Sequence, residues 1–177
     1  MIARRDSRPV GDHPPWSIRQ ATIDDIEQLV RLRLAMMAEV AGPRGGGVDP
    51  DSGKALAEAN RSYMEETMPT GEFVAYIVES GGAMVATSGL RVYRMAPHTG
   101  NLRGIGAYVL NMYTVPEWRG RGLASALLER LVEHAREAGA ISVSLRATAA
   151  GRPVYERYGF GGDSSFMSFH IADESQE

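Results

Sequence analysis

The sequence contains no cysteine and only one lysine among its 177 residues. Without cysteine the chain can form no disulfide, no thiolate metal site and no cysteine nucleophile. It also lacks any run of about 18 apolar residues, so we expect no transmembrane helix. Residues 1–16 hold no apolar stretch of the length that a signal peptide requires, and the expected location is the cytoplasm, without a membrane partner.

The chain likewise lacks an excess of basic charge. Its formal net charge is −3, which gives no reason to expect nucleic-acid binding. Apolar residues make up 44% and charged residues 23%, as in ordinary globular proteins. The basic residues are unevenly spread, because residues 117–157 carry seven arginines against five glutamates. A locally basic segment in an acidic protein indicates a small anionic ligand.

Length and hydrophobic periodicity predict one domain, over residues 16–172, between a mobile tail at 1–15 and a polar tail at 173–177. A Gly- and Pro-rich segment at 41–53 is expected to be a loop. The strands are predicted at 17–21, 72–80, 83–93, 106–115, 141–145 and 165–171, and the helices at 23–39, 54–68, 119–138 and 151–157. Consecutive antiparallel strands followed by a β-α-β unit predict an α/β fold with a mixed sheet.

The most informative segment is Leu110–Ala126, with the sequence LNMYTVPEWRGRGLASA. A buried strand is expected to end at Val115, where Pro116 breaks it, and a helix follows. Gly120 and Gly122 let the backbone turn tightly and approach a ligand. The unpaired N–H groups and the positive end of the helix dipole favour an anion such as a phosphate. The same glycine spacing occurs at ordinary strand–helix junctions, so the glycines alone do not decide the matter.

Arg119 and Arg121 add fork-shaped donors to this junction. The main alternative to a simple phosphate site is a dinucleotide-binding junction of Rossmann type, because Gly120, Gly122 and Ser125 approach the G-x-G-x-x-G fingerprint. That fingerprint requires an acidic residue at a strand end about 20 positions later. The acidic residue nearest to that position lies inside a predicted helix. An NADP-binding enzyme is therefore the second hypothesis.

Two motifs are similar to those of the GNAT superfamily of N-acetyltransferases. Arg119-x-x-Gly122-x-Ala124 resembles the family's acetyl-CoA signature, [Q/R]-x-x-G-x-[G/A]. Gly151–Phe160 resembles the family's late L-Y-E-x-x-G-F segment. The two motifs differ in chemistry and stand in the family's order, which makes coincidence a poor explanation. The resemblance covers residues 17–171 and implies a GNAT-like mixed, mostly antiparallel central sheet, flanked by helices and splayed at the acetyl-CoA site.

The resemblance implies that acetyl-CoA is the cofactor, and it assigns residues to it. Backbone groups at the end of the splayed strand would pair with the pantetheine arm, and a backbone N–H there would stabilise the oxyanion. The junction with the following helix would wrap the pyrophosphate. The implied cofactor-binding residues are Met112, Tyr113 and Thr114 in the strand, Arg119, Gly120, Arg121, Gly122, Leu123, Ala124 and Ser125 in the junction, and Thr148.

The family's late tyrosine corresponds to Tyr155, whose phenol would protonate the departing thiolate as a general acid. The chain departs from the family pattern at two positions. Thr148 stands where family members often carry an asparagine that contacts the cofactor arm. The strand at 141–145 holds no acid, although some members have a general-base glutamate there. The base is then elsewhere, is replaced by a water relay, or is unnecessary for an amine that arrives neutral.

Residues that contact the acceptor are the hardest to read from the sequence. Glu39, Asn111 and Tyr93 are candidates for contacts with the acceptor amine. No metal ligands are expected, because the four histidines are scattered along the chain. A mild acidic bias around the first two helices favours a cationic acceptor. The acids that create it are Asp49, Asp51, Glu58, Glu65 and Glu66.

The predicted function is direct transfer of an acetyl group from acetyl-CoA to a primary amine of a small molecule. Two alternatives stay open beside the Rossmann-type enzyme. One is a protein or peptide N-acetyltransferase, and the other is a sensor that binds acyl-CoA without catalysis. Dimers are common in the GNAT family, so a homodimer is a further expectation from the resemblance.

Overall fold

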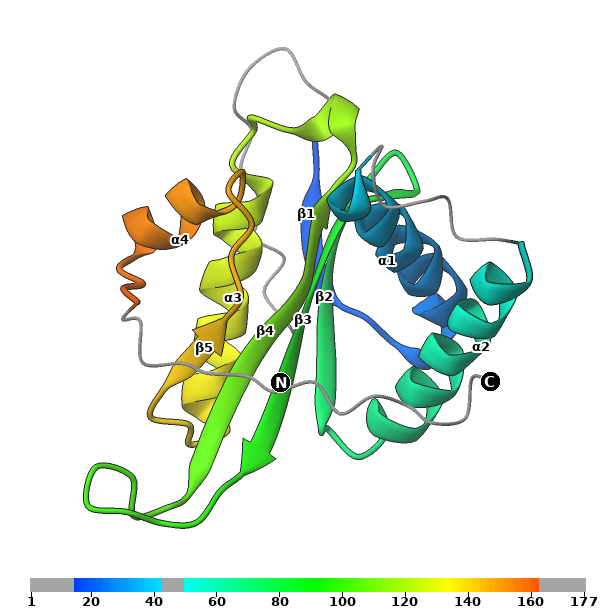
Figure 1. Ribbon diagram of the computed structural model, residues 1–177. Helices are drawn as coiled ribbons and strands as arrows, with labels where there is room; N and C mark the ends of the chain where they lie inside the picture. The colour runs from blue at the N-terminus through cyan, green and yellow to red at the C-terminus, as the bar shows by residue number, and fades with distance from the viewer. Residues whose placement is uncertain (1–14, 43–49, 163–177) are drawn as a thin grey trace.

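The described residues form a five-stranded sheet in the middle of the protein, with the strands in sequential order (Figure 1). The computed structural model describes residues 15–42 and 50–162. The strand predicted at 165–171 lies outside them, as do most of the tail at 1–15 and the tail at 173–177. The strands are β1 (Ser17–Gln20), β2 (Phe73–Ser80), β3 (Ala83–Arg94), β4 (Ile105–Thr114) and β5 (Val143–Leu145). The α-helices are α1 (Ile26–Ala41), α2 (Pro50–Thr67), α3 (Leu123–Glu137) and α4 (Arg152–Tyr158), and the 3-10 turns are η1 (Ile23–Asp25) and η2 (Pro116–Trp118).

The sheet is mixed and mostly antiparallel, as the sequence predicts. The pairs β1–β2, β2–β3 and β3–β4 are antiparallel, whereas β5 pairs with β4 in parallel. The parallel pair is joined by α3, in the β-α-β order that was expected. A Rossmann junction would stand in a sheet of mainly parallel strands. The topology therefore argues against the dinucleotide-binding alternative.

Helices cover both faces of the sheet. In Figure 1, α1 and α2 lie on one face, and α3 and α4 lie on the other. The helical periodicity explains this arrangement, because α1 buries Ile26, Leu29 and Val30 along one stripe. The stripe that α3 buries consists of Leu123, Leu127, Leu128, Leu131 and Ala135. Apolar cores consequently lie on both sides of the sheet, one beneath α1 and α2 and the other beneath α3 and α4.

One extra residue in β4 interrupts its pairing with β3. Asn111 and Met112 of β4 together oppose the single residue Ser88 of β3. Asn111 has a φ of 58°, and it is the one non-glycine residue with a positive φ in the described part of the chain. This left-handed geometry is typical of a β-bulge. Because a bulge shifts the side-chain alternation by one residue, Leu110 and Asn111 both face α1, whereas Met112 faces α3.

The start of α1 is fixed to the sheet by a cluster of hydrogen bonds. The Asp25 carboxylate accepts the backbone N–H of Thr22, at 2.8 Å, as part of a capping box. Arg19 of β1 donates to both oxygens of Asp25, at 2.7 and 2.8 Å, and pairs with Glu79 of β2 at 2.7 Å. The Arg19 hydrogen bonds in particular lower the pKa of Asp25 from 3.8 to about 2. This carboxylate is therefore charged throughout the neutral range.

The helix α2 begins earlier than the sequence predicts. The segment 41–53 was expected to be a loop, but Pro50–Gly53 form the first turn of α2. Proline suits a first helical turn, because its missing N–H would have no helical acceptor there. With 18 residues, α2 is also the longest helix among residues 15–42 and 50–162. No helix within these residues is long and apolar enough to cross a membrane.

Two further predicted boundaries are wrong, both beside the site described below. The helix predicted at 119–138 begins only at Leu123, because Gly120 and Gly122 adopt left-handed φ angles of 74° and 78°. Residues in that conformation cannot continue a right-handed helix. The strand predicted at 141–145 is shortened to the three residues of β5. Both corrections leave more irregular backbone between β4, β5 and α3 than the sequence indicates.

Candidate active site

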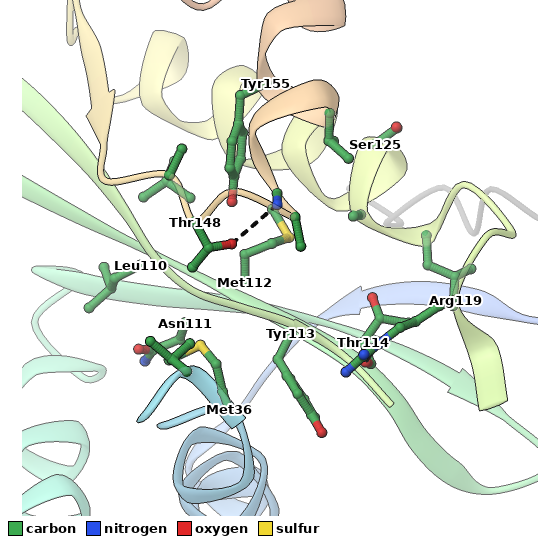
Figure 2. Close-up of a pocket in the computed structure, with 18 of the residues that line it drawn as sticks. Met36, Leu110, Asn111, Met112, Tyr113, Thr114, Arg119, Ser125, Thr148 and Tyr155 are labelled. Atoms are coloured by element: carbon green, nitrogen blue, oxygen red, sulfur yellow. Dashed lines mark hydrogen bonds between the residues drawn. The ribbon is translucent and has the colours of Figure 1, made fainter. Parts of the chain in front are cut away.

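A cleft of about 840 Å³ opens along β4, between α1 on one side and α3 and α4 on the other (Figure 2). Its wall comes from the second half of α1, most of β4, the β4–α3 junction, the segment after β5, and α4. Most of the predicted site residues meet there, although their roles stay predictions. The predicted residues that line the cleft are Glu39, Asn111, Met112, Tyr113, Thr114, Arg119, Gly120, Gly122, Leu123, Ala124, Ser125, Thr148 and Tyr155.

Two predicted site residues do not belong to the cleft wall. The Arg121 guanidinium lies 4.5 Å from the centre of the Trp118 ring and donates to the Glu117 carbonyl at 2.8 Å, which holds it against η2. Tyr93 pairs with Gly106 near the start of β4, and its ring covers that glycine. The register of β3 and β4 therefore places Tyr93 before the part of β4 that lines the cleft.

The β4 strand loses its neighbour partway along the cleft. β5 pairs with β4 only from Ala107 to Val109. From Leu110 to Thr114, the described residues supply no strand on that side of β4. An unpaired strand edge presents N–H and C=O groups that can pair with another amide-containing chain. The splay predicted from the resemblance is thus present, and its backbone groups fit the amides of the pantetheine arm.

The first turn of α3 forms an anion cradle next to this open edge. Gly122 precedes the helix, no side chain caps it, and no acid stands in its first turn. The backbone N–H groups of Leu123, Ala124 and Ser125 therefore lack helical acceptors, and all three residues line the cleft. A Cβ atom at Gly120 or Gly122 would meet no other atom within 4 Å, so the space beside both glycines is open. This combination of donors, dipole and space suits a pyrophosphate.

Arg119 links the anion cradle to α1. Its Nε donates to the Thr114 carbonyl at 3.0 Å, and its Nη2 donates to the Glu39 carboxylate at 2.6 Å. The hydrogen bond from Arg119 lowers the pKa of Glu39, so this carboxylate is charged at neutral pH. The two side chains are 43% and 48% exposed. An ion pair this exposed is weak, and a phosphate can replace the carboxylate as the partner of Arg119.

Tyr155 enters the cleft from α4. The side chain is only 8% exposed, and its ring packs edge-on against Phe160, with 6.0 Å between the ring centres. Figure 2 shows its hydroxyl pointing toward Thr148 and Met112. Burial raises the pKa of the phenol above its usual value of 10.0. The hydroxyl is therefore fully protonated at neutral pH, which a general acid requires.

Thr148 has a structural contact that the sequence does not reveal. Its hydroxyl oxygen accepts the backbone N–H of Gly151 at 3.1 Å, shown as the dashed line in Figure 2. Its backbone carbonyl accepts the N–H of Arg152 at 2.9 Å. Both bonds hold the turn that leads into α4 and hence the position of Tyr155. A hydroxyl that accepts one bond keeps its own proton for donation, so the predicted contact with the cofactor arm remains available.

The cleft is also lined by three arginines that the sequence analysis did not assign to the site: Arg33, Arg146 and Arg157. A signal for Arg33 was present, because it stands in the apolar stripe of α1 between Val30 and Leu34. A charged side chain at such a position is buried against the sheet and needs an explanation. Arg146 directly follows β5, and Arg157 lies within the late motif, so neither was distinguishable from a solvated surface residue.

Comparison with known proteins identifies the family. The model of the acetyltransferase (GNAT) family matches residues 43–160. An uncharacterised N-acetyltransferase of Escherichia coli, YjgM, is 29% identical over 146 residues, which are 81% of this chain and 80% of the relative. A mycothiol acetyltransferase of Propionibacterium freudenreichii is 31% identical over 142 residues, 77% of this chain but only 40% of that relative's length.

Solved structures agree with this result. A protein of Clostridium acetobutylicum, described as a predicted acetyltransferase and solved with acetyl-CoA, is 30% identical with a TM-score of 0.76, covering 88% of this chain and 96% of that one. A GCN5-related N-acetyltransferase of Ralstonia eutropha is 31% identical with the same TM-score, covering 89% and 99%. The resemblance seen in the sequence motifs is thereby confirmed. The chain belongs to the GNAT family of acetyltransferases, which are acyl-CoA-dependent enzymes, and acetyl-CoA is its cofactor.

Proposed function

We propose that the protein transfers the acetyl group of acetyl-CoA directly to a primary amine of a small molecule, with Tyr155 as the general acid. The observation that carries this proposal is the meeting of three features in one cleft. These are the open edge of β4, the uncapped N-terminus of α3 and the buried hydroxyl of Tyr155. One relative, the mycothiol acetyltransferase, is named for a small molecule, which supports the same substrate class.

The backbone positions the two ends of the cofactor. Acetyl-CoA supplies an activated acyl group as a thioester. The N–H groups of Leu123, Ala124 and Ser125 would hold its pyrophosphate, and the β4 edge would hold its pantetheine arm. A backbone N–H between Met112 and Thr114 would then polarise the thioester carbonyl and stabilise the oxyanion. These donors belong to regular secondary structure, so they need little reorganisation during the reaction.

Tyr155 supplies the proton that the leaving group needs. The amine nitrogen forms a bond to the thioester carbonyl carbon, and the carbon–sulfur bond breaks. The sulfur then takes the hydroxyl proton of Tyr155, which leaves CoA as the thiol. Because burial raises the pKa of this phenol, it gives up its proton only to a basic partner such as a forming thiolate. The phenolate regains a proton from solvent before the next turnover.

The proton of the amine must leave by another route. Glu39 is the one carboxylate among the described residues of the cleft wall, and Arg119 holds it. A carboxylate whose pKa is lowered by such a contact is a poor proton acceptor. We therefore infer that the amine reacts in its neutral form and releases its proton to water. This agrees with the absence of an acid from the strand at 141–145.

A pair of tyrosine variants on one helix tests this mechanism. Tyr155→Phe removes the hydroxyl and keeps the ring, and we expect kcat to fall by about 100-fold or more, since general acids contribute on that order. Tyr158→Phe is the matched control, because Tyr158 is 42% exposed on the same helix and lies outside the cleft wall. The measurement is thiol release from acetyl-CoA with a panel of amines, together with calorimetry of acetyl-CoA binding.

The outcomes separate the open alternatives. A Tyr155→Phe enzyme with full kcat would refute the general-acid role. Acetyl-CoA binding without turnover on any amine or peptide would favour the non-catalytic sensor. Turnover confined to peptide amines would favour the protein or peptide acetyltransferase. The expected homodimer and the cytoplasmic location stay predictions that these assays do not address.

A further inference from the structure

Arg33 places a positive charge on the side of the cleft formed by α1, which we assign to the acceptor and call the acceptor side. It lies in the middle of α1, on the stripe that faces the sheet, and it is partly buried. It also lines the cleft, on the side of β4 opposite Tyr155. Met36 and Asn111 also line this region, and Figure 2 shows Tyr155 and Thr148 across the strand from them. An acceptor bound between α1 and the open edge of β4 would therefore lie near this guanidinium.

The partners of Arg33 carry no charge. Its Nε donates to the side-chain oxygen of Asn60 in α2, and its Nη1 donates to the side-chain oxygen of Asn111 in the β4 bulge. Asn60 is itself fixed by a hydrogen bond from its Nδ2 to the Leu56 carbonyl, at 2.7 Å. No ion pair of Arg33 occurs among the described residues. The guanidinium is thus held in place by two neutral amides, without a carboxylate to balance its charge.

A partly buried cation without a counter-charge is costly. Burial disfavours the charged form, and the pKa of Arg33 is lowered by this loss of solvation. Arg33 nevertheless remains protonated at neutral pH, because a guanidinium titrates far above that range. Natural proteins pair such charges or use them to bind ligands. By contrast, Arg19 and Arg119 each contact a carboxylate in this structure.

The guanidinium of Arg33 also has unused donors. An arginine side chain has five N–H bonds arranged as a planar fork. Two of them are used in the bonds to Asn60 and Asn111, which leaves three, including both on Nη2. Because Asn60 and Asn111 fix the plane of the group, the remaining donors have a defined direction. This is the arrangement that binds a carboxylate or phosphate through two parallel hydrogen bonds.

The acidic bias that favoured a cationic acceptor does not reach the cleft. Asp51, Glu58, Glu65 and Glu66 are exposed on α2, and none of them lines the cleft wall. Asp49 lies outside the described residues. The carboxylate of Glu39 is engaged by Arg119, as described above. On the acceptor side, Arg33 is therefore the charge that an incoming substrate would meet without a protein counter-charge among the described residues.

We propose that the acceptor is a primary amine that also carries a small anionic group, a carboxylate or a phosphate, and that Arg33 binds this group. The inference rests on the proposed function, because it names the acceptor class of the same cleft. Arg33 acts here as a specificity-determining residue. Its neutral contacts to α2 and β4 fix its orientation, and its unused donors recognise the anion. The amine itself would then be directed to the edge of β4.

Matched acceptors test the proposal with the natural protein. We would measure kcat/KM by thiol release for alanine, alaninamide and ethylamine, and for the corresponding leucine and phenylalanine sets. Phosphoethanolamine and ethanolamine form the phosphate arm. We expect the anionic member of at least one set to exceed its neutral counterparts by tenfold or more. The arm with the larger ratio tells a carboxylate ligand from a phosphate ligand. Equal or higher values for the neutral members in every set would overturn the proposal.

Variants of α1 assign the preference to Arg33. In Arg33→Met the ratio between anionic and neutral acceptors should fall at least tenfold, whereas Arg33→Lys should keep part of it. Arg31→Met is the matched control, because Arg31 is exposed on the same helix and lies outside the cleft wall. The ratio is the decisive quantity, since a purely structural role of Arg33 would lower all acceptors alike. An unchanged ratio in Arg33→Met would overturn the assignment.

The design separates this inference from the proposed function. If Arg33→Met does not fold, the ratios of the natural enzyme and of Arg33→Lys still decide the matter. Absence of thiol release from every acceptor would refute the proposed function and the inference together. Thiol release from the neutral acceptors alone would refute only the anionic acceptor class and leave the transferase intact.

Discussion

The two halves of the cleft are built from different materials. The half that we assign to acetyl-CoA, the cofactor half, uses backbone, namely the open edge of β4 and the first turn of α3 after two glycines. The half that we assign to the acceptor, the acceptor half, uses side chains, with Arg33 of α1, Asn60 of α2 and Asn111 of β4 joined in one hydrogen-bonded group. A backbone site can serve every member of a family with one cofactor. A side-chain site can change with each substrate while the fold stays the same.

This difference determines how each half can be disturbed. The cofactor half should be sensitive to changes that fill space beside the backbone. The acceptor half should be sensitive to changes in charge and in the anchoring of α1. Three substitutions, taken from the largest expected effect to the smallest, separate the two halves.

The largest effect is expected from Gly122→Trp. An indole side chain at the N-terminus of α3 would occupy the open space beside the glycine, and a residue other than glycine is strained at a φ of 78°. We expect acetyl-CoA affinity to fall at least about 100-fold, or roughly 3 kcal/mol. Calorimetric titration with acetyl-CoA measures the change.

Gly71→Trp is the matched control for this substitution. Gly71 has a φ of 74°, its added Cβ would also meet no atom within 4 Å, and it does not line the cleft. The control should show the backbone strain in its thermal unfolding but bind acetyl-CoA normally. Wild-type affinity in Gly122→Trp would mean that the pyrophosphate binds elsewhere.

A smaller effect is expected from Asp25→Asn, at the anchor of α1. The pKa of Asp25 is lowered from 3.8 to about 2, mainly by hydrogen bonds from Arg19. Such a shift corresponds to about 2 kcal/mol of stability, present above pH 3.8 and lost as the pH falls from there toward 2. We expect the free energy of unfolding of the variant to be lower by about this amount at pH 7, with the difference shrinking below pH 4. Denaturant unfolding at several pH values measures it.

The control for Asp25→Asn is Asp24→Asn, since Asp24 is the exposed neighbour in the same turn. Its stability should change little. Because Asp25 anchors α1, the substitution should weaken acceptor turnover more than acetyl-CoA binding. Equal losses of turnover and of acetyl-CoA binding would contradict the division of the cleft into two halves. A pH-independent loss of stability would contradict the role of the Arg19–Asp25 pair.

The smallest effect is expected from Glu39→Gln, at the contact between the two halves. Glu39 occupies Arg119 in the absence of a phosphate, and its negative charge opposes anion binding. Removing the charge should therefore tighten acetyl-CoA binding by about threefold at low salt, because exposed pairs contribute less than about 1 kcal/mol. The gain should vanish at high salt. The control is Glu65→Gln, which makes the same charge change on α2, outside the cleft. Weaker acetyl-CoA binding in Glu39→Gln would instead mean that the Glu39–Arg119 pair supports the site.

Most residues that the sequence assigned to the cofactor line one cleft, because the information that brings them together is local. Residues 119–122, Arg-Gly-Arg-Gly, form one turn, and both glycines have left-handed φ angles, which glycine adopts easily. The mixed sheet was likewise predictable, since its strands follow one another in the chain and pair in that order. Arg121 is the exception, because its contact with Trp118 depends on side-chain packing rather than on the motif.

The hydrogen-bonded group that we assign to the acceptor was not predicted, because its parts are far apart in the chain. Arg33, Asn60 and Asn111 come from three elements, and nothing local says that they meet. Arg33 gave a signal, a charge in an apolar stripe, but the sequence does not say which partners it finds. Tyr93 was assigned to the acceptor site from its strand, and the register moved it away. The described acids of the charge bias around α2 are exposed and do not line the cleft, a placement that composition cannot predict because it does not distinguish the outer face of a helix from its inner face.

The bulge at Asn111 has a consequence for how β4 can vary among related sequences. Replacing a residue of this strand changes one side chain, whereas losing one residue at the bulge would restore strict alternation. The later residues of β4 would keep their faces, Met112 toward α3 and Tyr113 toward α1, but loss of Asn111 would remove the side-chain oxygen that accepts the Arg33 hydrogen bond. Insertions and deletions are usually tolerated in loops. In this strand the bulge is the position at which one residue can be lost while the later residues still face the same walls of the cleft, whereas a deletion elsewhere in β4 would turn part of the strand to the opposite face.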